Sequence, residues 1–112
     1  MIELNVFKGD DKDWTIYFKD SAGDPIDITG STLYFTVKTL KTDATADAKI
    51  KKDITSHTDP TGGETTLTLT DDDTDIDVGV YFFDFKLVDS AGKKTTYVVG
   101  NFRVAQQVTS RI

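Results

Sequence analysis

The tetrapeptide Asp20–Gly23 (DSAG) recurs as Asp89–Gly92, and each copy follows a run of alternating apolar residues. Asp at the first position of a type I turn, with Gly at the fourth where φ can be positive, is the chemistry of a tight β-turn. More strand-like sequence follows the second copy. We therefore expect a β-hairpin there, with a three-residue loop whose Gly92 forms a bulge.

Period-two alternation of apolar and polar residues recurs along the chain, in residues 14–19, 32–38, 66–70 and 81–88. Weaker examples occupy residues 2–7, 48–54 and 95–104. Such alternation indicates strands with one face on a core and the other toward water. About seven short strands separated by turn signals predict one domain, residues 1–112, folded as an all-β antiparallel sandwich. The residues expected in its core include Trp14, Phe35, Phe83 and Phe85.

Two local patterns lie close together near residue 75. Thr70 and Asp73 have the spacing of a capping box, which predicts a single helical turn over Asp71–Thr74. Gly79 lies two residues before Tyr81, at the start of a predicted strand. This arrangement predicts a tyrosine corner, in which the hydroxyl bonds to backbone a few residues upstream.

Two registers are open for the last strand. The favoured one pairs Phe85 with Tyr97 and Phe83 with Val99, and it requires a bulge near residues 100–101 to keep the rest of the strand on the core. The alternative register is unbroken and leaves Tyr97 and Val99 exposed. Its core set is Val98, Phe102 and Val104.

Composition restricts the class of protein. Nineteen acidic against 13 basic residues give a net charge of −6, which argues against a nucleic-acid partner. The chain has no cysteine, so disulfides and thiolate metal sites are excluded. No apolar run approaches membrane-spanning length, and the charged first 13 residues do not read as a signal peptide. We expect neither a nucleic-acid nor a membrane partner.

Residues with catalytic or metal-binding potential lack the partners that such sites need. A calcium loop starting at Asp71 would require Gly and Glu where the chain has Ile76 and Phe82. His57, the only histidine, lies among Thr, Pro and Gly and is expected at the surface. Gly62-Gly63 lacks the Lys-Ser/Thr of a phosphate loop. We expect no catalytic residue, no metal and no cofactor, and hence no enzyme.

The string Phe18–Lys38 (FKDSAGDPIDITGSTLYFTVK) resembles the strand, turn and "P-I-D-I/L-T-G" signature of the N-terminal domain of phage baseplate upper proteins. Matching blocks occur in the family's order along essentially the whole chain: residues 8–10 (KGD), 67–74 (LTLTDDDT), 79–87 (GVYFFDFKL) and 89–104. The resemblance implies an immunoglobulin-like β-sandwich in a phage or prophage virion, serving as a docking module.

In that family further segments follow this domain, whereas here the sequence ends soon after the last strand. We therefore expect a small adaptor subunit of a tail or baseplate, assembled in the host cytoplasm, rather than a receptor-binding arm. Its expected partners are other virion proteins, and a homo-oligomer stays open. Phe82 is the first candidate for the interface, because its ring lies opposite the core face of its strand. Further candidates are Tyr17, Tyr34, Tyr97 and Val99.

Three alternatives remain. A capsid decoration protein would share the same fold and setting. A carbohydrate-binding or adhesin module is a second alternative, because sandwiches are common scaffolds and Tyr17 or Tyr34 could contribute an aromatic platform. A metal-dependent enzyme of sandwich fold is the third, disfavoured by the single histidine.

Overall fold

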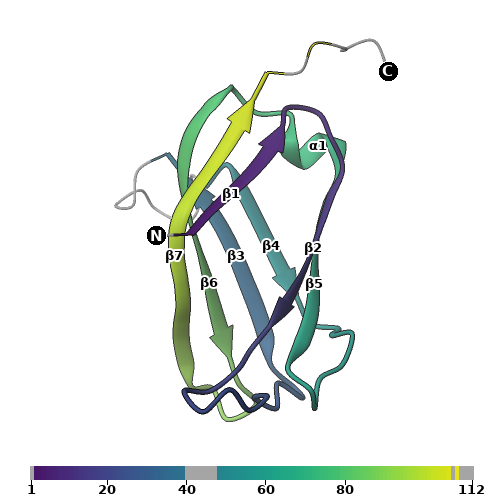
Figure 1. Cartoon of the computed structure of the whole chain (residues 1–112), viewed down its shortest axis with the longest axis vertical. Coiled ribbons are helices and arrows are strands. Elements are labelled where there is room, and N and C mark those ends of the chain that lie inside the picture. Colours follow the sequence, from purple (N-terminus) through teal and green to yellow (C-terminus); the bar gives the residue numbers. More distant parts are fainter. Residues whose placement is uncertain (1, 40–47, 107, 109–112) are drawn as a thin grey trace.

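The computed structural model describes residues 2–39, 48–106 and 108, in which the chain forms seven strands and one helical turn (Figure 1). The helical turn is the only helix in this part of the chain, and none there is long and apolar enough to cross a membrane. The elements are β1 (Ile2–Phe7), β2 (Lys12–Tyr17), β3 (Thr32–Lys38), β4 (Ile50–Ile54), β5 (Glu64–Leu69), α1 (Asp71–Thr74), β6 (Gly79–Val88) and β7 (Lys94–Ala105).

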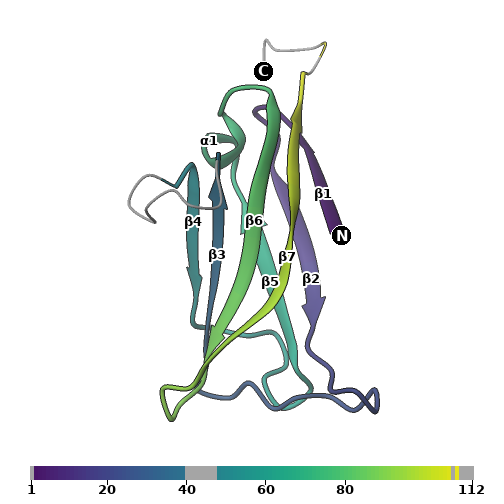
Figure 2. The ribbon, with the colours of Figure 1, turned by 90° about the vertical axis from the view of Figure 1, so that its left-hand side faces the viewer.

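The strands form two layers (Figures 1 and 2). A five-stranded sheet has the order β1-β7-β6-β3-β4, and β2 and β5 form a two-stranded sheet. The run β7-β6-β3-β4 matches the G-F-C-C′ order of a variable-type immunoglobulin sheet, and β2 and β5 match strands B and E. The predicted all-β sandwich of about seven strands is therefore confirmed. One pair departs from the antiparallel expectation, because β1 runs parallel to β7.

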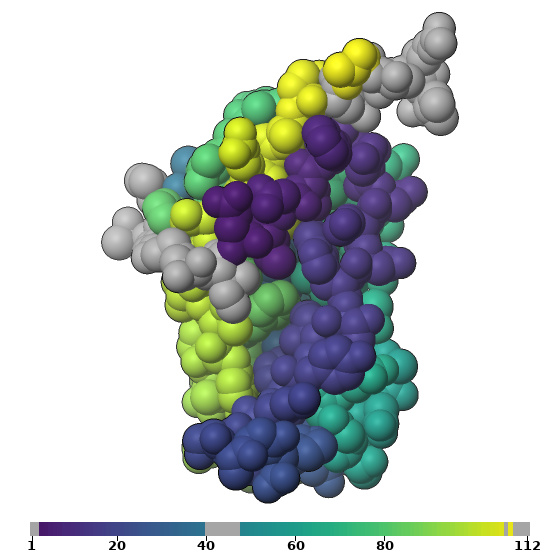
Figure 3. All heavy atoms as spheres, viewed as in Figure 1, coloured from purple at the N-terminus to yellow at the C-terminus, as the bar shows by residue number. Residues whose placement is uncertain are grey.

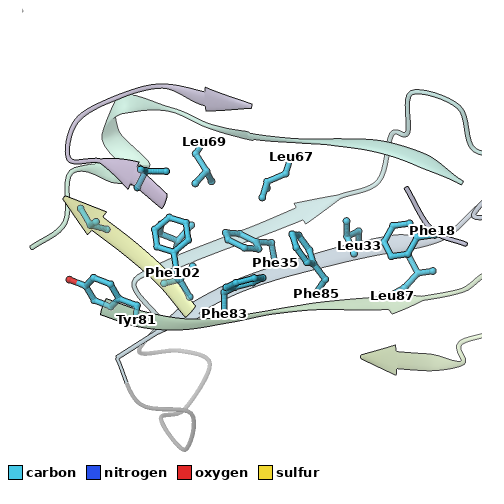
Figure 4. Packing of buried hydrophobic residues seen from close by; sticks show 14 of the residues in the cluster. Phe18, Leu33, Phe35, Leu67, Leu69, Tyr81, Phe83, Phe85, Leu87 and Phe102 are labelled. Atoms are coloured by element: carbon cyan, nitrogen blue, oxygen red, sulfur yellow. The ribbon is translucent and has the colours of Figure 1, made fainter. Parts of the chain in front are cut away.

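The core fills the space between the two layers, with Phe35 at its centre (Figure 4). The Phe35 side chain is fully buried, and its ring centroid lies 5.8, 5.1 and 6.0 Å from those of Phe83, Phe85 and Phe102. Burying each such side chain stabilises the fold by about 1.5–3 kcal/mol. The predicted core positions of Phe35, Phe83 and Phe85 are confirmed.

Trp14 lies at the margin of this core and is only half-buried. Its ring meets the edge of Phe102 at 6.4 Å, and the Lys12 ammonium lies 5.9 Å from the ring centroid. The prediction that Trp14 is a core residue is therefore only partly right, because Trp14 packs against the core but is not buried in it. The cause is that β2 is an edge strand, and no strand among the described residues covers its free side.

The two DSAG turns have the same geometry. The Gly23 amide donates to the Asp20 carbonyl oxygen at 3.0 Å, and the Gly92 amide donates to the Asp89 carbonyl oxygen at 2.9 Å. Both glycines have φ of +85°, which a side chain would disfavour. Each Asp carboxylate also accepts from backbone amides two and four residues on. The predicted tight turns, and the hairpin that joins β6 to β7, are confirmed.

The bulge in β7 lies at Tyr97, and its predicted place near residues 100–101 is wrong. Phe85 pairs with Val98 and Lys86 pairs with Thr96, which leaves Tyr97 as the extra residue. Beyond the bulge the alternative register holds, with a core-facing set of Val98, Phe102 and Val104. The bulge turns the Tyr97 ring edge-on against Phe18, with 5.0 Å between centroids. This contact reaches across to the segment that follows β2.

Candidate interaction surfaces

The five predicted interface residues divide between two parts of the surface. Phe82 and Val99 lie together on the outer face of the five-stranded sheet, where they line one pocket with Thr36, Lys38, Phe83 and Asp84. Phe82 is half-buried and Val99 is 46% exposed. Tyr34, 37% exposed, lies on the same face but does not line the pocket.

Val80 extends the apolar surface around Phe82. It lies two residues before Phe82 on β6, on the same face, and is 59% exposed. We call Val80, Phe82 and Val99 the outer-face patch. Figure 2 views the sheet from the side on which β6 and β7 lie in front. Charged residues flank the patch, since Lys38 pairs with Phe82, Arg103 pairs with Val80 and Asp84 pairs with Val99.

Tyr17 and Tyr97 belong to a second place, a groove of about 360 Å³ between the two sheets. We call it the seam groove. Figure 3 shows a hollow between β2 and β7, below β1. The groove is lined by Leu4, six successive residues from Trp14 to Lys19, Phe85, Tyr97 and Val98. Sequence reasoning missed this groove, because it depends on which strands remain unpaired.

The acidic run that follows β5 serves as a helix cap. The Thr70 side chain accepts from the Asp73 amide, and the Asp73 carboxylate accepts from the Thr70 amide at 2.8 Å, so the predicted capping box is confirmed. The Lys52 ammonium also lies 2.6 Å from that carboxylate. Partial burial raises the pKa of Asp73, but hydrogen bonds from Lys52 and Thr70 outweigh it and leave the pKa below its usual value. In the described ranges, no group of three His, Asp or Glu side chains is placed to hold a metal ion.

His57 joins the two sheets rather than lying free at the surface, so that expectation is wrong. Its Nε2 donates to the Ser31 carbonyl oxygen at 2.7 Å, and its Nδ1 lies 2.9 Å from the Thr65 hydroxyl. Ser31 comes just before β3 and Thr65 lies in β5, and both are buried. The local sequence resembles a solvated loop, and only the folded chain brings these two partners to the ring.

A scan against models of known protein families gives no match to this chain, and a search of curated proteins gives none either.

Proposed function

We propose that the chain is a non-enzymatic structural protein of a phage virion, a small docking or adaptor subunit of a tail or baseplate. It works by contact with other virion proteins through the outer-face patch. The observation that carries this proposal is an apolar patch that includes an aromatic ring, on the outer face of the five-stranded sheet. The resemblance of residues 18–38 to phage baseplate upper proteins supplies the virion setting.

The outer-face patch has the chemistry of a small protein interface. Aromatic side chains are enriched in the cores of interfaces, and a polar rim surrounds them. Here Phe82 is the aromatic centre, with Val80 and Val99 beside it and Lys38, Asp84 and Arg103 at the rim. Strand β6 is paired on both sides, with β3 and with β7, so the backbone that carries Val80 and Phe82 is held in place before a partner arrives. Such preorganisation reduces the entropy lost on binding.

Side chains that could take part in catalysis instead make contacts that stabilise the fold, which supports a non-enzymatic function. Asp73 caps α1 and binds Lys52, and His57 joins the two sheets. The Tyr81 hydroxyl donates to the Asp77 carbonyl oxygen. Each of these groups has a stabilising contact that accounts for its position.

The test is detection of the chain in purified phage particles by mass spectrometry, for the natural sequence and for two variants. Phe82→Thr removes the aromatic centre, whereas the control Val88→Thr changes the same strand and outer face away from the patch. Loss of a central aromatic anchor costs at least about 2 kcal/mol of binding, so we expect Phe82→Thr to lower incorporation by more than about tenfold. Val88→Thr should incorporate normally.

Folding of both variants is checked by their denaturation midpoints. Absence of the natural chain from particles would overturn the proposal. Glycan binding that is unchanged by Phe82→Thr would favour the adhesin alternative instead. Sedimentation of the purified chain tests the open question of a homo-oligomer, and a Phe82-dependent dimer would make a second copy the partner of the patch.

A further inference from the structure

The seam groove lies beside a strand edge that has no partner in the described part of the chain. Strand β2 pairs with β5 on one side, and no described strand lies on its other side. Six successive residues of this segment, from Trp14 to Lys19, line the groove. In a strand, successive side chains point to opposite faces, so an unbroken run in one lining means that the strand presents its backbone edge.

The hydrogen-bonding direction of β2 agrees with this reading. The Phe18 amide donates to the Gly63 carbonyl oxygen, on the β5 side. Backbone groups of an antiparallel strand alternate in direction, so the amides and carbonyls of Thr15 and Tyr17 point away from β5. These two residues line the groove. They therefore offer it a ready set of donors and acceptors.

The opposite wall of the groove includes Tyr97 and Val98 of β7. Strand β1 pairs with β7 only from Gly100 to Ala105, so residues 94–99 have no described strand on that side. The bulge at Tyr97 interrupts the regular edge here, and bulges disfavour further strand pairing. Of the two walls, β2 is therefore the one prepared to pair with an added strand.

The fold itself explains the vacancy. In an immunoglobulin sandwich of the constant type, the first strand, A, lies beside strand B in the same sheet. Here the first strand, β1, lies beside β7 in the other sheet, so the place next to β2 holds no described strand. We propose that the seam groove accepts an extended segment of a partner protein as an added strand, antiparallel to β2.

The lining predicts the chemistry of that segment. Apolar side chains at alternate positions would cover Leu4, Trp14, Phe85 and Val98 in the interior of the groove. Lys19 is the one charged residue of the lining, and its ammonium lies 6.0 Å from the Tyr17 ring centroid. Because Lys19 is the only charged side chain in the lining, it favours a segment that carries a carboxylate at the rim of the groove. Strand addition of this kind takes its affinity from main-chain bonds and its specificity from alternate side chains.

This proposal does not depend on the virion setting. It uses the seam between the sheets, whereas the outer-face patch lies on the other side of the five-stranded sheet. A failure of one therefore leaves the other standing.

The first test measures binding of fluorescein-labelled peptides of about eight residues, a usual strand length, in which Val or Phe alternates with Thr and Glu. Thr15→Pro removes an amide that points into the groove. The control is Thr66→Pro: Thr66 is the partner of Thr15 in β5, and its amide points to the opposite edge of the same sheet. We expect Thr15→Pro to weaken binding by about tenfold or more, and Thr66→Pro to leave it unchanged. Lys19→Glu should weaken binding of the Glu peptides and favour peptides with Lys in their place.

The second test joins one such peptide to Met1 through a flexible Gly/Ser linker, which raises its effective concentration to the millimolar range. Amide hydrogen exchange should then slow at Thr15 and Tyr17, and the denaturation midpoint should rise. A tethered peptide with a central proline should do neither. Unchanged exchange at both amides with the alternating peptide would overturn the proposal. Binding of an oligosaccharide that perturbs Trp14 and Tyr17, without peptide binding, would overturn it in favour of a sugar site.

Discussion

The hydroxyl of Tyr81 donates a hydrogen bond of 2.6 Å to the carbonyl oxygen of Asp77, four residues upstream. The bond ties the connection after α1 to the start of β6, and the side chain of Tyr81 is only 7% exposed. This is the tyrosine corner predicted from the sequence. Burial raises the pKa of Tyr81 above its usual value of 10.0, the Asp77 carboxylate raises it further, and Lys8 partly offsets them.

Replacing Tyr81 with Phe removes this bond and leaves the ring. We expect Tyr81→Phe to lower the free energy of unfolding by about 0.5–1.5 kcal/mol at neutral pH. Because the folded pKa is raised, the contribution of the neutral hydroxyl is complete below about pH 10 and is lost as pH rises through the folded pKa. The difference in unfolding free energy between the two proteins should therefore shrink above pH 10. Tyr34→Phe, at the surface, is the control and should change stability by less than about 0.5 kcal/mol.

Phe85 tests the centre of the core. Its ring lies 5.1 Å from that of Phe35 and 5.6 Å from that of Phe83, and its side chain is buried. We expect Phe85→Ala to lower the free energy of unfolding by about 3–5 kcal/mol, out of a usual total of about 5–15 kcal/mol. Chemical denaturation measures the change. Val78→Ala, in an exposed turn, is the control, and an equal midpoint for both variants would contradict the packing described.

Asp73 links the helix cap to β4 through Lys52. Asp73→Asn keeps the size of the side chain but removes the charge, and we expect it to lower the free energy of unfolding by about 0.5–2 kcal/mol at neutral pH. The folded pKa of Asp73 is lowered, so its contribution is present above its usual value of 3.8 and is lost as pH falls through the folded pKa. The variant should thus approach the natural protein in acid. Asp72→Asn, exposed in the same turn, is the control and should change the free energy of unfolding at neutral pH by less than about 0.5 kcal/mol.

Two glycines give opposite expectations for the same substitution. A Cβ at Gly63 would lie 2.6 Å from the Phe18 carbonyl oxygen and 2.7 Å from that of Ile26, and φ there is +71°. We expect Gly63→Ala to cost at least about 1–3 kcal/mol from backbone strain, with the clash in addition. A Cβ at Gly79 would meet nothing within 4 Å, so Gly79→Ala should stay within about 0.5 kcal/mol. Thermal unfolding distinguishes them, and equal midpoints would refute the account of Gly63.

Features set by neighbouring residues could be predicted from the sequence. The DSAG turns, the Thr70–Asp73 capping box and the Tyr81 corner each depend on side chains within four residues of the backbone that they bind. The exposure of Val80 beside Phe82 follows from the alternation of β6, because the core face of that strand is unambiguous. Local chemistry decides each of these without knowledge of the fold.

Features set by distant contacts could not be predicted. At the bulge, the Tyr97 ring packs against the Phe18 ring, which lies 79 positions away in the sequence (97 − 18). The role of His57 depends on Ser31 and Thr65, and the seam groove depends on β1 pairing with β7 instead of β2. The alternation of apolar and polar residues predicts which side chains of a strand face the core, but it does not predict which strands pair with one another.

We propose above that the outer-face patch contacts another protein in an assembled phage particle. The most direct measurement places a photo-crosslinking amino acid at position 82 or, as a control, at position 88 of the same strand, and irradiates purified phage particles. We expect position 82 to crosslink to a different virion protein, identified by mass spectrometry, and position 88 to give no such crosslink. Particles that contain the chain but give no crosslink from position 82, or that lack the chain altogether, would contradict it.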